Sequence, residues 1–398
     1  LNRGRMADGI EVVGAGPAGL AAAITLARAG RRVRIHEARR AVGGRFGADL
    51  QGLENWTGSG DVLDDFRAAG LTTAFENLPC PQGVAIDAWD RRYRMASDGP
   101  IFYLVERGPG PRSLDSALLA QAQSLGVEVR FGSRVQGLEG PGIVATGPGR
   151  AEALAVGWHF ETAMADGFWL LLDDEVAPKG YAYLLVMNGR GTVKSCMFAG
   201  FRQQRLYAER TVERFRRLVG LKMDNPRRHG GVGRLYPLAS ASLSSKAAVG
   251  ESAGFQDALA GFGMRYAIRS GVLAAQALLD GEDYEMAWRR ELARSMQESE
   301  VNRALFATLG NRGYRWLLLA QERSGDTRRF LRWLYRPKIW QPGLLRWARH
   351  RRRKAGADEG LEVDDLRDPG GDSHHGRGED AGCGEDAGHD EVAAPRWR

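Results

Sequence analysis

The feature that most constrains the fold is a glycine-rich turn between a short apolar strand and a helix, close to the start of the chain. Residues 10–14 predict the strand, and residues 17–29 predict the helix, with proline in its first turn and Gly30 at its end. The turn reads GAGPAG over residues 14–19, and the alternating residues 32–37 predict a second strand. Strand, turn, helix and strand in this order predict a dinucleotide-binding βαβ unit within an α/β fold.

The positions of the turn have separate roles in such a unit. Gly14 permits a tight turn, Gly16 lets the backbone approach a pyrophosphate, and Gly19 lets the helix pack closely on the strand. Pro17 and Ala18 lie at the helix N-terminus, where unpaired N–H groups and the helix dipole favour phosphate. The alternative is a glycine-rich turn that serves packing alone.

Further candidate cofactor residues follow the second predicted strand. Glu37 ends this strand, 18 residues after the turn, and is followed by Ala38. Its carboxylate can accept the hydroxyls of an adenosine ribose and would repel a 2′-phosphate. A second glycine pair, Gly43 and Gly44, lets the backbone lie against a ligand, and Arg45 can offer its guanidinium to a phosphate. For Arg45 the alternative is a surface salt bridge.

A second glycine-rich segment lies far along the chain. Residues 247–250 predict a buried strand that ends at Gly250 and Glu251, and a helix is expected from about residue 263 to residue 279. A carboxylate at Glu251 suits a ribityl hydroxyl. Gly261, Gly263 and Met264 would place helix N–H groups against the flavin edge that gains negative charge on reduction. Two such segments at opposite ends of one chain predict one long bipartite ligand, and FAD fits.

The second segment carries a family resemblance. It reads GESAGFQDALAGFGMRYA over residues 250–267 and resembles the GDAAGFVDPLTGEGIRYA stretch of geranylgeranyl reductases, flavoproteins with the p-hydroxybenzoate hydroxylase fold. The likeness extends to Arg107 followed by LDSAL at residues 114–118, and to Tyr181 and Tyr183, where the family has a Y-x-W-x-F-P strand facing the isoprenoid. The chain departs from the family at Glu251 for aspartate, at Ala258 for proline, and at Tyr183 for tryptophan.

The resemblance implies a Rossmann-like FAD-binding domain with an inserted, mainly antiparallel β-sheet substrate domain and a helical C-terminal region. It also implies that Arg107 lies near FAD and that Tyr181 and Tyr183 face the substrate. We expect residues 7–55, 105–150 and 235–285 in the FAD-binding domain, 56–104 and 151–234 in the substrate domain, and 286–350 in C-terminal helices. Residues 351–398 predict a disordered, basic-then-acidic tail.

The activity that the resemblance implies is reduction of C=C bonds in an isoprenoid or other lipophilic substrate, by hydride transfer from reduced flavin. Tyr181 and Tyr266 are candidate proton donors by their chemistry alone, and NAD(P)H and ferredoxin are the candidate electron donors. The alternatives are a flavin monooxygenase for a hydrophobic or aromatic substrate, and a flavoprotein without net redox turnover. Residues 144–148 read VATGP where monooxygenases of this fold carry A-D-G-x-x-S, which favours the reductase.

Composition limits the partners. Cys80, Cys196 and Cys383 lie far apart and form no zinc-binding spacing, so we expect no metal site. No apolar run reaches the length of a transmembrane helix and no signal-peptide core is present, so we expect a cytoplasmic protein. Residues 312–354 mix tryptophan with arginine, which favours either peripheral membrane contact or a helical cap with arginine stems over aromatic rings. A nucleic-acid partner is not expected.

Overall fold

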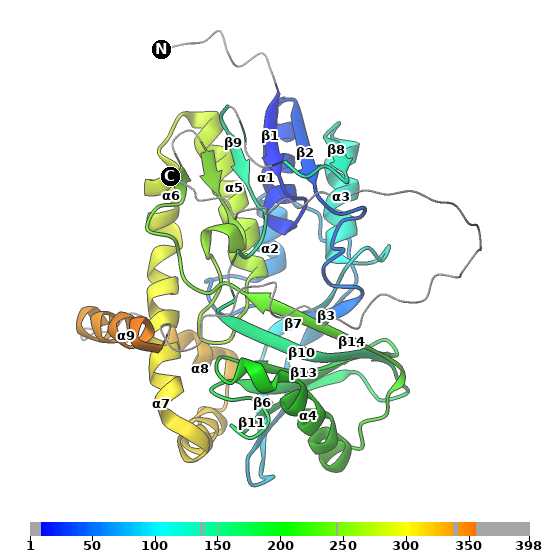
Figure 1. The fold of residues 1–398 in the computed structure, drawn as a ribbon, viewed down its shortest axis with the longest axis vertical. Helices are drawn as coiled ribbons and strands as arrows, with labels where there is room; N and C mark the ends of the chain where they lie inside the picture. Colours follow the sequence, from blue (N-terminus) through cyan, green and yellow to red (C-terminus); the bar gives the residue numbers. More distant parts are fainter. Residues whose placement is uncertain are drawn as a thin grey trace, which may run out of the picture.

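The computed structural model of the 398-residue chain describes residues 9–135, 138, 140–149, 151–243, 246–336 and 341–355. Three sheets form its frame, and helices cover them (Figure 1). Of the predicted tail, residues 351–355 belong to the last helix, and residues 356–398 lie outside the described residues.

The first sheet is the predicted Rossmann-like sheet. Its spatial order is β15 (Ser242–Leu243), β16 (Lys246–Ala248), β9 (Gly142–Val144), β1 (Ile10–Val13), β2 (Val33–Glu37) and β8 (Glu128–Phe131). All neighbouring strands are parallel except β15 and β16. The central strand β1 pairs with β9, which lies about 130 residues later in the chain, and β9 pairs with β16, which lies about 100 residues later still.

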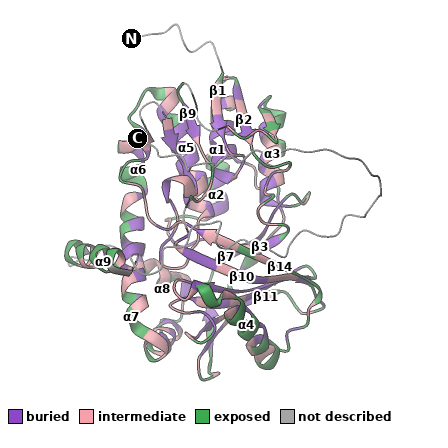
Figure 2. Cartoon of the chain, viewed as in Figure 1, coloured by how far each residue is buried: buried purple, intermediate pink, exposed green. Residues whose placement is uncertain are grey.

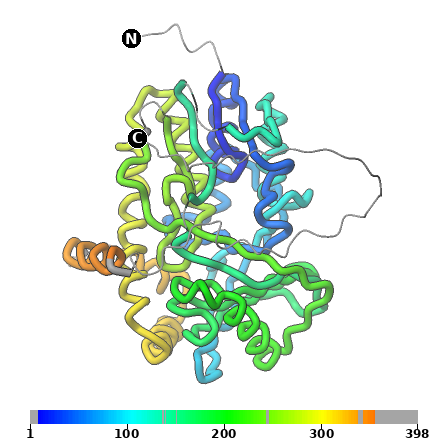
Figure 3. Tube along the Cα trace, viewed as in Figure 1, coloured from blue at the N-terminus to red at the C-terminus, as the bar shows by residue number. Residues whose placement is uncertain are grey.

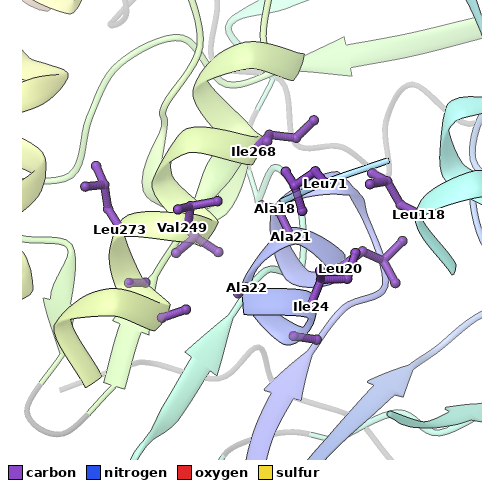
Figure 4. Close-up of a cluster of buried hydrophobic side chains, with 14 of the residues drawn as sticks. Ala18, Leu20, Ala21, Ala22, Ile24, Leu71, Leu118, Val249, Ile268 and Leu273 are labelled. Atoms are coloured by element: carbon purple, nitrogen blue, oxygen red, sulfur yellow. The ribbon is translucent and has the colours of Figure 1, made fainter. Parts of the chain in front are cut away.

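Three helices pack side by side against this sheet, with α1 (Pro17–Arg28) between α3 (Leu114–Ser124) and α5 (Met264–Asp280) (Figure 1). The α1 sequence PAGLAAAI presents small side chains, so α5 can approach closely. A Cβ added at Gly271 would lie 2.1 Å from the Ala18 carbonyl oxygen. Figure 4 shows Ala18 and Ala21 of α1 near Ile268 of α5. Figure 3 shows α1 as a blue tube beside the yellow-green tube of α5.

The second sheet is a middle layer of three antiparallel strands, in the order β3 (Asp49–Glu54), β7 (Phe102–Arg107) and β4 (Asn77–Cys80). The short helix α2 (Val62–Ala68) follows β3 in the chain. Because β3 contacts α5 on one side and β12 and β13 on the other, this layer joins the Rossmann-like part to the third sheet.

The third sheet has seven strands and is mainly antiparallel, as predicted; only β5 and β11 pair in parallel. Its order is β14 (Asp224–Gly233), β10 (Ala153–Glu161), β13 (Arg190–Met197), β12 (Tyr181–Met187), β11 (Gly167–Leu172), β5 (Gln82–Asp87) and β6 (Arg92–Ala96). The helix α4 (Gln204–Val219) packs on it through buried side chains such as Val212 and Phe215.

The C-terminal region is helical, as the resemblance implies. It comprises α6 (Tyr284–Glu291), α7 (Ala293–Arg323), α8 (Thr327–Leu334) and α9 (Gln341–Ala355). Helix α7 is interrupted at Gly310, whose φ of 59° and ψ of −176° are not helical. Figure 2 shows α1 and α5 mostly buried and α9 largely exposed. None of the helices in the described part of the chain combines the length and apolarity needed to cross a bilayer.

Candidate cofactor site

The glycine-rich turn after β1 has the geometry that its sequence predicts. Gly14 has a φ of 104°, and a Cβ added there would lie 2.2 Å from the Ala145 carbonyl oxygen. A Cβ at Gly19 would lie 2.0 Å from the Gly14 carbonyl oxygen, so both positions require glycine. Gly16 instead faces open space, with no atom within 4 Å of an added Cβ. No side chain caps the helix that begins at Pro17, which leaves its first N–H groups available for a phosphate.

Glu37 lies against this turn at the end of β2. Its Oε2 accepts a hydrogen bond of 2.8 Å from the Ala15 amide, and its Oε1 accepts one of 2.9 Å from the Arg39 amide. The sequence predicts a carboxylate beside the turn, and the structure places one there, with Ala38 following. Its position at the open edge of the turn suits a ribose.

The second glycine-rich segment meets the first. Gly250 has a φ of 59°, and a Cβ added there would lie 3.0 Å from the Ala18 Cβ. The close crossing of α1 and α5 makes this meeting possible. The two segments that the sequence assigns to opposite ends of one ligand therefore lie beside each other at their strand ends. Gly263 precedes α5, whose N-terminus also has no side-chain cap, and Met264 is buried in its first turn.

Arg45 joins the loop that follows β2 to the second glycine-rich segment by an ion pair. Its Nη1 lies 2.7 Å from Glu251 Oε2, and its Nη2 donates to the Val232 carbonyl oxygen. Arg45, which the sequence predicts to bind a phosphate, and Glu251, which it predicts to bind the ribityl chain, thus form an ion pair with each other. Before Arg45, Gly43 has a φ of 61° and an added Cβ there would lie 2.7 Å from the Gly108 Cα, while Gly44 follows it in the turn.

Arg107 lies at the end of β7, behind the Arg45 loop. Its guanidinium donates to both carboxylate oxygens of Asp115, at 2.7 and 3.0 Å, and both side chains are buried. It also lies over the Phe46 ring, with 4.3 Å between the guanidinium carbon and the ring centroid. Arg107 therefore supports the loop of residues 43–48, and its paired guanidinium has limited capacity for a ligand.

The loop from Asp257 to Phe262 precedes the predicted flavin-facing glycines. It closes through hydrogen bonds of 2.9 Å from the Asp257 amide to the Phe262 carbonyl and from the Gly261 amide to the Asp257 carbonyl. The buried Asp257 carboxylate accepts from the Leu259 and Ala260 amides, at 3.2 and 2.9 Å. Burial raises the pKa of Asp257 to about 6, although these hydrogen bonds oppose the rise. The sequence prediction missed this carboxylate.

The predicted substrate tyrosines lie between this loop and the third sheet. The Tyr181 hydroxyl donates to the Ala260 carbonyl oxygen. Burial raises the pKa of Tyr181 and of Tyr183 well above the usual value, so both are neutral hydroxyls at pH 7. Tyr266 is buried as well. Its hydroxyl has no well-formed hydrogen bond to any of the described residues, and burial raises its pKa. Of the two proton-donor candidates, Tyr181 thus hydrogen-bonds to the loop, and Tyr266 has no such bond to the described residues.

Aromatic rings pack together next to Tyr181 in a buried cluster. Phe262 packs edge-on against Trp56, with ring centroids 4.8 Å apart, and lies 6.3 Å from Phe102. A Cβ added at Gly52 would lie 2.6 Å from the Phe262 ring, which shows how closely β3 approaches it. Tyr181 therefore lies against a buried aromatic cluster in which Trp56, Phe102 and Phe262 pack together.

A buried polar cluster joins the middle layer to the third sheet and was not predicted. Lys194 Nζ lies 2.6 Å from Asp49 Oδ2 and 2.9 Å from His229 Nδ1. His229 Nε2 donates to the Arg45 carbonyl oxygen at 3.0 Å, so its Nδ1 accepts from the ammonium group. Burial and the neighbouring Lys194 charge lower the pKa of His229. Burial alone would raise the pKa of Asp49, but Lys194 and His229 outweigh it and hold that pKa below its usual value.

The comparisons with known proteins agree with this geometry. Residues 12–49 match the NAD(P)-binding Rossmann-like domain family. A geranylgeranyl bacteriochlorophyll reductase-like protein of Thermoplasma acidophilum superimposes with a TM-score of 0.65 at 16% identity, over 90% of this chain and 99% of its own. The p-nitrophenol 4-monooxygenase of Pseudomonas putida superimposes with a TM-score of 0.58 at 16% identity, over 83% of this chain and 99% of its own. The chain has the fold of flavin-dependent oxidoreductases. The predicted fold class is confirmed.

Sequence similarity reaches only part of the curated relatives. An FAD-dependent monooxygenase of Beauveria bassiana is 31% identical over 167 residues, which is 40% of this chain and 37% of that protein. The chain thus spans just over a third of the length of the curated relatives that it matches.

Proposed function

We propose that the chain binds FAD and acts as an oxidoreductase. The observation that carries the proposal is the meeting of the two glycine-rich segments at Gly250 and Ala18. The residues suit the cofactor, because Gly16 faces open space beside an uncapped helix N-terminus and Glu37 lies at the edge of the turn. One ligand with an adenylate at one end and a ring system at the other can reach both segments.

We further propose that the substrate is lipophilic and that its C=C bond is reduced, as in an isoprenoid. The aromatic cluster of Trp56, Phe102 and Phe262 beside Tyr181 supports an apolar substrate, and the similarity to a geranylgeranyl bacteriochlorophyll reductase-like protein supports this reaction class. FAD supplies the hydride when it is bound and reduced. The chain's own part is to exclude water with this aromatic cluster and to hold the neutral Tyr181 hydroxyl at the loop of residues 257–262.

A flavin monooxygenase is the second candidate, favoured by the curated similarity to an FAD-dependent monooxygenase. The two activities differ in their need for oxygen. We propose reduction with dithionite under anaerobic conditions, followed by mixing with geranylgeranyl compounds. Flavin reoxidation without oxygen supports the reductase, whereas a product that forms only with oxygen supports the monooxygenase. Repeating the reduction with NAD(P)H and with reduced ferredoxin identifies the electron donor. A preparation that stays colourless after incubation with FAD would refute both activities.

We also propose a peripheral membrane contact through residues 312–354. Trp316 on α7 is 68% exposed and Trp333 on α8 is 52% exposed, and arginines accompany both. Exposed tryptophan with arginine suits an anionic lipid surface. Co-sedimentation with phosphatidylserine vesicles tests this contact. Binding by the native chain that is lost in W316A and W333A supports it, and equal recovery of all three proteins in the supernatant contradicts it.

A further inference from the structure

The loop from Asp257 to Phe262 is held by side chains that come from the C-terminal helices. It is short and contains Gly261, and Gly263 follows it directly before α5. Its backbone N–H and C=O groups donate and accept hydrogen bonds within the protein. Buried acceptors and donors without partners are costly, so whichever groups satisfy them decide which shape of the loop is stable.

Helix α7 supplies two of these groups. Arg303 is 4% exposed, and its Nη1 donates to the Leu259 carbonyl oxygen at 3.1 Å while its Nη2 donates to the Lys179 carbonyl oxygen. Its guanidinium carbon lies 4.1 Å from the Phe198 ring centroid. Ser299 Oγ accepts a hydrogen bond of 3.1 Å from the Ala258 amide. The loop is thereby joined to α7 at two successive residues.

Arg303 holds these carbonyl oxygens without a salt bridge. Among the described residues no acidic oxygen lies within salt-bridge distance of its guanidinium, and burial lowers its pKa. The nearby Asp257 carboxylate opposes this lowering only in part, so the buried guanidinium contributes little to stability. Its position is better explained by what it holds, namely the Leu259 carbonyl of the loop and the Lys179 carbonyl at the start of β12.

Tyr335, just after α8, supplies the third group. Its hydroxyl donates to Asp257 Oδ1 at 2.8 Å, and both side chains are buried. The Asp257 carboxylate in turn accepts hydrogen bonds from the Leu259 and Ala260 amides. Tyr335 therefore holds the orientation of the carboxylate that holds the loop backbone. The Ala260 carbonyl also accepts the hydrogen bond from the Tyr181 hydroxyl, which joins the loop to β12 of the third sheet.

We propose that Arg303 and Tyr335 are positioning residues of the cofactor site, which hold the 257–262 loop in the shape that lets its glycine end meet the flavin. The C-terminal helices are then part of the site and not only a cover over it. This inference rests on the proposed FAD binding. It assigns no contact between either residue and the cofactor.

The experiment compares Tyr335→Phe with Tyr314→Phe. Tyr314 is a matched control because it also lies in the C-terminal helices, is buried, and donates its hydroxyl to an aspartate, Asp174 Oδ1 at 3.1 Å, and not to a residue of the loop. Both variants lose one hydroxyl-to-carboxylate bond, so we expect similar losses in thermal stability. Only Y335F should weaken FAD binding, by about tenfold, and only Y335F should speed amide exchange at residues 257–263. R303Q should behave like Y335F, and R303K should recover part of the affinity.

Three results decide the inference. Weaker FAD binding and faster loop exchange in Y335F but not in Y314F support it. FAD affinity and loop exchange in Y335F that match Y314F overturn it, whatever the loss of thermal stability. Native protein that takes up no FAD overturns the proposed function and with it the cofactor role. The exchange comparison on the cofactor-free chain then still decides whether Tyr335 holds the loop.

Discussion

Replacing Gly271 by alanine tests the contact that brings the two glycine-rich segments together. In the native chain α5 crosses α1 at Gly271, and an added Cβ would lie 2.1 Å from the Ala18 carbonyl oxygen and 3.3 Å from the Ala18 Cα. Real Cβ atoms do not approach an oxygen so closely, so the helices must separate by about 1 Å to reach an ordinary contact. Because the obstacle is helix backbone, rotation of a side chain cannot relieve the clash.

The expected cost follows from two opposing effects. Overpacking of this kind destabilises by about 1–3 kcal/mol. Alanine in place of glycine within a helix such as α5 returns up to about 1 kcal/mol. We therefore expect G271A to lose about 1–2 kcal/mol of unfolding free energy and a few degrees of melting temperature. A separation of about 1 Å should also weaken FAD binding by about tenfold, because α1 and α5 each lead from one of the two segments.

Thermal unfolding and a titration with FAD measure both effects. The control is Gly343→Ala in α9, an exposed helical glycine where an added Cβ meets nothing within 4 Å. G343A should unfold at the native temperature or slightly above it, and bind FAD as the native chain does. If G271A matches G343A in both measurements, the close crossing of α1 and α5 is not what joins the segments.

Three further predictions concern single carboxylates and their partners. Glu37→Ala removes the acceptor beside the glycine-rich turn, so FAD affinity by titration should fall about tenfold; unchanged affinity would contradict the ribose role. Lys194→Met leaves Asp49 buried without its cation and should cost about 3–5 kcal/mol near pH 7. The native pair stabilises above the ordinary pKa of Asp49 and loses this effect as pH falls through the lowered native pKa, so the deficit of K194M in chemical unfolding should shrink on acidification. The pKa of Asp257 is raised from 3.8 to about 6, so its contribution to folding is fully present below about pH 4 and is lost as pH rises through 6. The free energy of unfolding should fall by a few kcal/mol over this range. Melting temperatures across this range should therefore fall less with rising pH in D257N than in the native chain, and parallel curves would refute the shift.

The part of the site that could be predicted is the part encoded locally. The turn at residues 14–19 is followed within one βαβ unit by Glu37, so spacing alone places the carboxylate beside the turn. The second segment was recognisable for the same reason, because a strand end, glycines and a helix start follow one another within about 20 residues. The meeting of the two segments required one further inference, that both serve a single ligand.

The rest of the site depends on pairings across long stretches of chain. Asp49, Lys194 and His229 come from three strands, and no spacing in the sequence relates them. The sequence places residues 56–104 in one domain, and no local pattern separates β4, which pairs with β7 in the three-stranded layer, from β5 and β6, which join a different sheet. Asp257 lies inside a recognised motif. Its role became visible only through Tyr335, 78 residues later in the chain.

The order of strands in the first sheet has a consequence for how the chain folds on the ribosome. Strand β1 is synthesised before all its neighbours, and its flank on one side is built by β9 and then β16, which ends at Ala248. At roughly 5–20 residues per second, about 10–40 seconds pass between the synthesis of Glu37 and that of Ala248. For about the first half of this interval the β1 edge of the nascent βαβ unit has no neighbour, and once β9 has been made the open edge is that of β9, until β16 follows. Chaperone demand during translation should therefore be greatest before residue 248 and should fall once α5 has closed over α1.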